Sequence, residues 1–185
     1  MRKLFVRAKT VKGKKYAYLV KNVCKKGKVK QITKKYLGKI IDLSETKQKV
    51  EENNESFFEN NIDFSQNINS IMKQLIINEF ESLGFVFDSK HTLRKGEPKS
   101  KEEIIIKLTK KVKFLQNKKH VVLFFNNRYV YPKLIELLLD FYEPESEDDK
   151  KGEKLAFRLR DAGINIEQED FIQLYRLIYL SNNEN

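Results

Sequence analysis

The stretch Gly13–Ile40, GKKYAYLVKNVCKKGKVKQITKKYLGKI, decides how the N-terminal part of the chain folds. Tyrosine and β-branched residues, which favour strands, are mixed there with lysines, and the glycines at 13 and 27 mark tight turns. In residues 3–9 apolar side chains at every second position indicate a further strand with one solvated face. These patterns predict three strands joined by two short turns, a three-stranded antiparallel β-meander. Gly38 is expected to end the third strand with a positive φ.

The charges are sorted into blocks along the chain, whose formal net charge is +11. Residues 1–41 hold fifteen Lys and Arg and no Asp or Glu, whereas residues 42–103 hold eight basic and thirteen acidic residues. Residues 104–135 hold eight basic residues and no acidic ones, and residues 136–185 hold six basic and thirteen acidic residues. A proteome that merely favours lysine would raise glutamate as well, so the sorting indicates a basic N-terminal face.

The chain divides by composition into three parts. We predict a basic β-sheet domain at 1–41, an acidic linker at 42–65 and a mostly helical α/β module at 66–185. In the last part, apolar residues with helical spacing predict helices at 65–83, 100–116, 132–142, 153–162 and 167–180. Short apolar runs predict strands at Phe85–Phe87 and Val121–Phe125. The predicted fold class is therefore α+β, an N-terminal three-stranded meander followed by a mostly helical module with one or two short strands.

The helix expected at Ser100–Gln116 also carries charge. Ser100 and Glu103 have the spacing of a capping box, and the buried stripe behind them consists of Ile104, Ile105, Leu108, Val112 and Leu115. Basic residues on the opposite side and just downstream define a secondary basic track: Lys107, Lys110, Lys111, Lys118, Lys119 and Arg128. Such a face either extends a phosphate-binding surface or only solvates the helix, and the pattern leaves both alternatives open.

Lysines interleaved with tyrosines in residues 1–41 predict a nucleic-acid-binding sheet, because Lys and Arg replace counterions at phosphates and tyrosine rings can stack on bases. The candidate binding residues are Arg2, Lys3, Arg7, Lys9, Lys12, Lys14, Lys15, Tyr16, Tyr18, Lys21, Lys25, Lys26, Lys28, Lys30, Lys34, Lys35, Tyr36 and Lys39. The tyrosines could equally form the apolar face that a three-stranded sheet needs. Alternation does not decide which face carries the contacts, because a one-residue bulge would reverse the assignment.

The order of these elements resembles the N-terminal segment of DDE-type insertion-sequence transposases of archaea and bacteria. The resemblance covers residues 1–40, and the matching residues are Gly13, Lys14, Tyr16, Tyr18, Leu19, Val20, Gly27, Lys28, Val29, Gln31, Tyr36, Leu37, Gly38 and Lys39. In that family the segment precedes a long catalytic domain and belongs to the DNA-engaging region. The resemblance implies DNA binding for this chain and does not imply transposition.

The sequence lacks the motifs of common catalytic and cofactor sites. GxxxxGK[ST], GxGxxG, HExxH and GxSxG do not occur. Cys24, with only His91 and His120 beside it, cannot complete a structural zinc site. The chain after residue 42 is too short for the RNase H-like sheet on which transposases hold two metal ions. We therefore expect a protein that is not an enzyme and that uses no cofactor and no metal.

These observations predict a DNA-binding protein, transposase-related or of a chromatin or regulatory type, with duplex DNA favoured over RNA. Two alternatives stay open, an RNA-binding or ribonucleoprotein-associated module and a non-enzymatic protein-interaction adaptor. The C-terminal helices offer a surface through which the chain could form a homodimer. No apolar run approaches the roughly 20 residues of a membrane helix, and no signal-peptide pattern follows Met1. We expect no membrane partner and a cytoplasmic, nucleoid-associated location.

Overall fold

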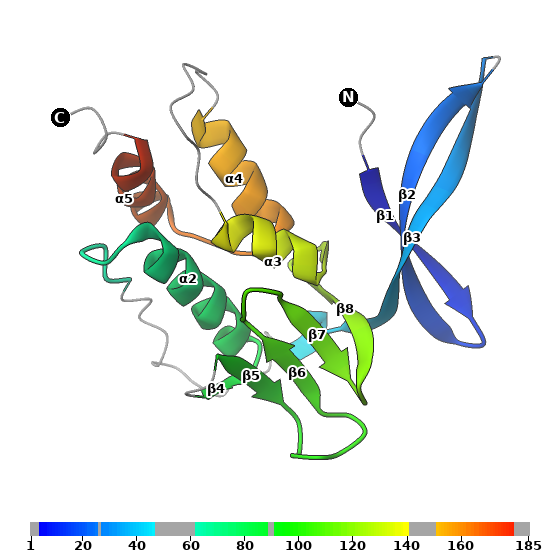
Figure 1. Ribbon diagram of the computed structural model, residues 1–185, viewed down its shortest axis with the longest axis horizontal. Coiled ribbons are helices and arrows are strands. Elements are labelled where there is room, and N and C mark those ends of the chain that lie inside the picture. Colours follow the sequence, from blue (N-terminus) through cyan, green and yellow to red (C-terminus); the bar gives the residue numbers. More distant parts are fainter. Residues whose placement is uncertain (1–3, 26, 47–61, 89–90, 141–150, 180–185) are drawn as a thin grey trace.

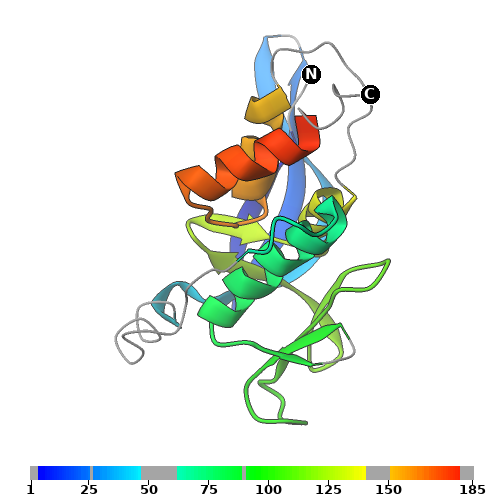
Figure 2. The same ribbon diagram turned by 90° about the vertical axis from the view of Figure 1, so that its left-hand side faces the viewer.

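The computed structural model describes residues 4–25, 27–46, 62–88, 91–140 and 151–179, which form one mixed β-sheet with helices on one of its faces. The strand order is β1-β2-β3-β8-β7-β6-β5-β4, and β9 pairs with β8 outside this path. Figure 1 shows β1–β3 as a long twisted projection on one side of the molecule and the helices on the other. The view in Figure 2, turned by 90°, places the helices in front of this projection.

The first three strands form an antiparallel arm. β1 (Leu4–Val11) pairs with β2 (Lys14–Lys25), and β2 pairs with β3 (Lys28–Asp42). Val11 lies opposite Lys14, so Lys12 and Gly13 form a two-residue turn. Their φ angles of 48° and 75° are the positive values that a type I′ hairpin turn requires. We call residues 4–38 the arm.

Two β-bulges interrupt the regular pairing of β3 with β2. Relative to an unbroken ladder, β3 carries two extra residues, Leu37 and Lys34. Each bulge increases the local twist and moves the side chains beyond it to the other face of the sheet. As a result, Tyr36 lies opposite Tyr18.

The end of β3 joins the arm to the rest of the sheet. Lys39–Asp42 runs parallel to residues 121–124 of β8. Gly38 has a φ of 136°, yet it does not end the strand as predicted, because β3 continues to Asp42. A Cβ atom at Gly38 would lie 2.4 Å from the backbone oxygen of His120, so the missing side chain lets the two strands approach.

Short hairpins build the rest of the sheet. Its strands are β4 (Val86–Asp88), β5 (Thr92–Lys95), β6 (Ile104–Lys107), β7 (Lys113–Gln116), β8 (Lys119–Phe125) and β9 (Arg128–Val130). β7 pairs with the start of β8 and β9 with its end. The turns on either side of β8 are Asn117-Lys118 and Asn126-Asn127, and all four residues have positive φ. Asparagine tolerates this conformation better than most residues, which favours a tight turn at both places.

Four helices are described beside the sheet: α2 (Ile68–Ser82), α3 (Pro132–Leu139), α4 (Lys151–Asp161) and α5 (Gln168–Tyr179). α2 is capped by Asn67, whose side chain accepts a hydrogen bond from the amide of Ser70 at 3.0 Å. Pro132 stands in the first turn of α3, where its missing N–H costs nothing. No helix within the described ranges is long and apolar enough to cross a membrane.

β8 separates two apolar clusters. The odd-numbered residues of 121–125 belong to the main core beneath the helices. Val122 forms a smaller cluster with Ala17 and Ile40 on the opposite face. Because Ala17 belongs to β2 and Ile40 to β3, this second cluster packs the base of the arm against the body.

The predicted fold class is wrong. The described residues between 66 and 185 contribute six strands, and the three N-terminal strands do not form a separate sheet, because β3 pairs with β8. The predicted boundary after residue 41 falls at the end of β3, and the three-part division of the chain stays a prediction.

The largest single error concerns Ser100–Gln116, which forms β6, a turn and β7 instead of a helix. The Ser100 hydroxyl does accept a hydrogen bond from the Glu103 amide at 3.0 Å, and the Glu103 carboxylate accepts one from the Lys99 amide at 3.0 Å. These capping groups close a turn and start no helix. The β-branched run Ile104–Ile106 comes next and favours an extended strand.

Candidate nucleic-acid interface

Three tyrosines gather on one face of the arm. Tyr16 and Tyr18 are two residues apart on β2, and the bulge at Leu37 brings Tyr36 of β3 beside them. The ring centroid of Tyr36 lies 6.3 Å from that of Tyr16 and 5.4 Å from that of Tyr18. Tyr36 is 54% exposed, whereas the other two side chains are half-buried. The cluster therefore offers one exposed aromatic side chain supported by two others.

Cations lie on the same face as the tyrosines. Directly opposite residues of neighbouring strands project from one face, and Lys9 is opposite Tyr16 while Arg7 is opposite Tyr18. The Lys9 ammonium lies 5.1 Å from the centroid of the Tyr18 ring, within cation–π range. We call the surface formed by Arg7, Lys9, Tyr16, Tyr18 and Tyr36 the tyrosine face.

The Tyr36 phenol is neutral on this positively charged face. Partial burial raises the pKa of the Tyr36 phenol, and the neighbouring Tyr16 and Tyr18 act in the same direction. The phenol therefore stays protonated near neutral pH. A neutral phenol can donate a hydrogen bond to a phosphate or base oxygen, which a phenolate cannot do.

The predicted binding residues are divided between the two faces of the arm. Besides Arg7 and Lys9, the tyrosine face carries Lys14 and Lys39. The opposite face carries Lys15, Lys21, Lys28, Lys30 and Lys35. Lys12 lies in the first turn, and Lys34 is one of the two bulge residues. Arg2, Lys3, Lys26 and the side chain of Lys25 lie outside the described residues.

Among the residues that the structure describes, the arm narrows to two strands at its end. Leu4, the first described residue of β1, lies opposite Lys21, so residues 22–25 of β2 have β3 as their only described neighbour. Within the described part of the chain, residues 22–25 and 28–31 therefore form a two-stranded ribbon, which we call the ribbon tip. At about 3.3 Å per residue, its four residue pairs span roughly 13 Å. Figure 1 shows the ribbon tip pointing away from the helices.

Two polar residues of the ribbon tip were missed by the sequence analysis. Asn22 and Gln31 lie directly opposite each other, and both are exposed. Counting every second residue along β2 from Tyr16 and Tyr18 would have placed Asn22 on the tyrosine face. Gln31 could not be placed in this way, because two bulges separate it from Lys39.

The secondary basic track does not form a continuous row, because the helix expected to carry it is absent. Lys107, Lys110 and Lys111 lie at the β6–β7 turn, Lys118 and Lys119 at the β7–β8 turn, and Arg128 at the start of β9. The two ends of β7 thus carry separate groups. The β7–β8 turn is tied to the arm, since the Lys39 ammonium donates to the Gln116 side-chain oxygen at 3.2 Å, opposite Lys119.

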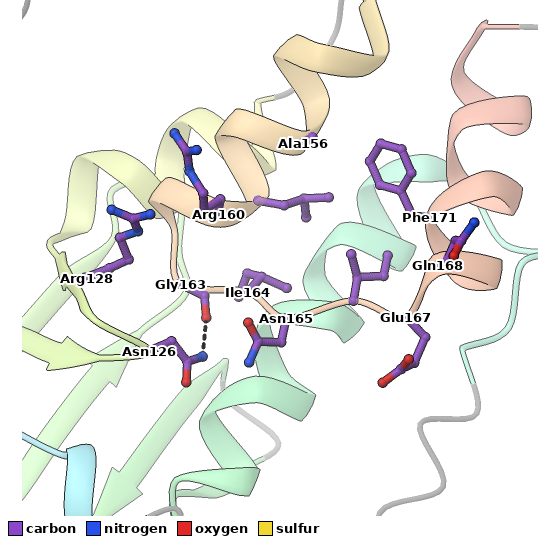
Figure 3. Close-up of a pocket in the computed structure, with 12 residues that line it drawn as sticks. Asn126, Arg128, Ala156, Arg160, Gly163, Ile164, Asn165, Glu167, Gln168 and Phe171 are labelled. Carbon is purple, nitrogen blue, oxygen red and sulfur yellow. Dashed lines mark hydrogen bonds between the residues drawn. The ribbon is translucent and has the colours of Figure 1, made fainter.

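A cavity of about 610 Å³ lies between the β8–β9 turn, α4 and the start of α5 (Figure 3). Arg128, Arg160 and Phe171 are among its lining residues. Arg160 is 3.6 Å from the Asp161 carboxylate, and its guanidinium lies 4.6 Å from the centroid of the Phe157 ring. Glu167 also lines the cavity, so its wall carries charges of both signs and does not select an anionic ligand.

A buried carboxylate holds the elements around this cavity together. Glu79 of α2 accepts hydrogen bonds from the Asn126 side chain at 2.8 Å and from the Asn165 amide at 3.1 Å. The Asn126 amide also donates to the Gly163 carbonyl at 2.8 Å, the dashed line in Figure 3. These bonds connect α2, the β8–β9 turn and the loop before α5, which gives Glu79 and Asn126 a structural role.

Comparison with protein-family models, curated proteins and solved structures gives no match. The resemblance of residues 1–40 to transposases therefore stays a prediction. Within the described ranges, no group of three or more His, Cys, Asp or Glu residues could hold a metal ion.

Proposed function

We propose that this chain is a DNA-binding protein whose arm contacts the phosphates of duplex DNA. The observation that carries the proposal is an arm within residues 1–41, a segment without any acidic residue, that has lysines on both faces. Lys and Arg that replace condensed counterions at phosphates supply most of the affinity of such proteins. A projecting arm can place both of its faces near the two strands of a duplex.

The shape of the ribbon tip favours duplex DNA as the ligand. The major groove of B-DNA is about 12 Å wide and admits a two-stranded β-ribbon. With the ribbon tip in the groove, we expect Lys28 and Lys30 of the tip and Lys9 of the tyrosine face to contact phosphates on the groove rims. Phosphate contacts of this kind position a protein on DNA but do not determine sequence.

A homodimer formed through the C-terminal helices stays a prediction. Leu155 and Leu159 of α4 and Leu174 of α5 are buried in the main core of the chain itself. Phe157 of α4 and Ile172 of α5 are exposed to 43% and 40%. These two side chains are where a second copy would pack.

A salt titration tests the proposed function. If the arm makes about six phosphate contacts, the plot of log K against log salt for duplex DNA should have a slope near −5. Replacing four arm lysines, Lys9→Gln, Lys14→Gln, Lys28→Gln and Lys30→Gln, should make the slope shallower by about 0.9 for each lost contact. The matched control removes the same charge at the β6–β7 turn: Lys107→Gln, Lys110→Gln, Lys111→Gln and Lys113→Gln.

The control variant should keep the slope and the affinity of the unaltered protein. Two results would contradict the proposal. A slope near zero would show that phosphates are not the ligand. An equal loss in both variants would show that total charge, and not the arm, determines binding.

A second candidate function is binding of unpaired RNA or DNA, and the exposed Tyr36 side chain is the observation that favours it. Stacking of a base on an aromatic side chain contributes about 1–3 kcal/mol. Competition among duplex DNA, single-stranded DNA and RNA of equal length separates the two functions. A preference for single strands that Tyr36→Leu abolishes selectively would support this second function over the first.

A further inference from the structure

The two faces of the ribbon tip differ in their chemistry. The face that continues the tyrosine face carries Asn22, Cys24, Val29 and Gln31, none of which is charged. All four are exposed, and Val29 is exposed to 68%. The opposite face carries Lys28 and Lys30. An uncharged surface of amides and small apolar groups thus lies in the most basic segment of the chain.

One of these amides is held in a fixed orientation. Arg7 of β1 donates a hydrogen bond from Nη1 to the side-chain oxygen of Gln31. Arginine has only donors, so the oxygen of the Gln31 amide must face Arg7. The two N–H groups of that amide are therefore left to donate elsewhere. Asn22 lies directly opposite Gln31 and places a second amide beside the first.

We propose that the uncharged face of the ribbon tip is the base-contacting surface of this protein, with Asn22 and Gln31 as the residues that determine sequence preference. The inference rests on the proposed function, since it names the part of the arm that meets the floor of the major groove. Base edges are uncharged and present hydrogen-bonding groups, whereas the groove rims carry the phosphates. Asn forms paired hydrogen bonds with adenine in this groove, which suits Asn22. The two N–H groups of Gln31 can donate to base acceptors such as purine N7, guanine O6 or thymine O4, and apolar groups such as Val29 contact the thymine methyl group.

The charges around the uncharged face of the ribbon tip match the major groove, in which uncharged base edges lie between two rows of phosphates. Lys28 and Lys30 on the other face have long side chains that can extend to the groove rims, and Arg7 adds a cation next to Gln31. Asn22 and Gln31 would be poor phosphate ligands compared with the lysines that surround them, because they carry no charge. Their place on a basic ribbon is explained by contacts to bases.

Selection of binding sites from a pool of random duplexes tests this inference. The unaltered protein should enrich a short common sequence containing A·T pairs. The double variant Asn22→Ala/Gln31→Ala should bind random duplex as tightly as the unaltered protein, with the same salt slope. Its preference for the selected sequence over random duplex should fall about tenfold or more for each lost base contact. The control Thr10→Ala removes an exposed polar group of the arm outside the ribbon tip. It should change neither the affinity for random duplex nor the preference for the selected sequence.

The possible failures are distinguishable. Salt-dependent binding without any enriched sequence would overturn the inference and leave the proposed function intact. An enriched sequence that the double variant still prefers would also overturn it, because the contacts would then lie elsewhere. No binding to any duplex would overturn both the inference and the proposed function.

Discussion

Gly38 is the residue at which the arm meets the body of the sheet. Its φ of 136° disfavours any side chain, and a Cβ atom there would lie 2.4 Å from the backbone oxygen of His120. Gly38→Ala therefore combines backbone strain with a clash against main chain that cannot rotate away. We expect a loss of about 3 kcal/mol or more in the free energy of unfolding, measured by urea denaturation.

Gly13→Ala is the matched control for this substitution. Gly13 also has a positive φ, 75°, but a Cβ atom at this position would have no neighbour within 4 Å. Only the conformational cost remains, about 1 kcal/mol. Equal losses in the two variants would show that close approach of β3 and β8 does not depend on Gly38.

At the scale of single elements, the β6–β7 hairpin gives the clearest test of the architecture. In β6 Ile106 is fully buried and Ile105 is half-buried, as alternation along a strand requires. A helix at 100–116 would instead bury Ile105 in its apolar stripe. Ile106→Ala should cost about 2–5 kcal/mol in the free energy of unfolding, and Ile105→Ala no more than about half as much. A larger loss for Ile105→Ala in thermal or urea unfolding would contradict the strand.

The same hairpin shows why part of the fold could not be predicted. The turns at Gly13 and Gly27 are set by local chemistry, and the strands of the arm lie where alternation places them. The Ser100 hydroxyl accepts from the Glu103 amide as in a capping box, whereas the Glu103 carboxylate accepts from the Lys99 amide. Hydrogen bonds of this kind form in a turn as well as at a helix start. The β-branched run Ile104–Ile106 favours an extended β6, and its pairing with both β5 and β7 completes a strand that the capping residues alone do not indicate.

The layout of the candidate nucleic-acid interface also depends on contacts between residues that are far apart in the sequence. The lysines of the arm could be predicted as a group from the absence of acids in residues 1–41. Their division between two faces could not, because the bulges of β3 are set by pairing geometry and leave no simple mark in the sequence. The Glu79–Asn126 bond joins residues 47 positions apart and has no local signal.

At the scale of the whole molecule, charge is unevenly distributed between the arm and the body. Residues 1–41 hold fifteen basic residues and no acidic ones, so lysines on neighbouring strands repel one another when no anion is bound. Salt should relieve this repulsion, since the Debye length falls from about 10 Å at 0.1 M to about 3 Å at 1 M. Amide hydrogen exchange should slow in β1–β3 as NaCl is raised over this range.

The exchange of α2 serves as the internal reference for that measurement. α2 is packed on the main core and lies outside the basic segment, so its protection should change much less with salt. Parallel changes in α2 and in the arm would mean that salt acts on the global stability of the protein. Faster exchange in the arm at high salt would contradict the repulsion between its lysines.

The bulges of β3 have a consequence for how this protein can diverge. Gain of a single codon between Ala17 and Tyr18 in β2 would give Leu37 a partner, restore the regular ladder there and turn Tyr18 and Tyr36 away from Tyr16, although no side chain on the surface had been replaced. Insertions opposite a bulge would therefore change the chemistry of the arm in one evolutionary step. A comparison of related sequences that counts only substitutions would overlook this change. An alignment that misplaces one gap would assign every later residue of the strand to the wrong face of the sheet.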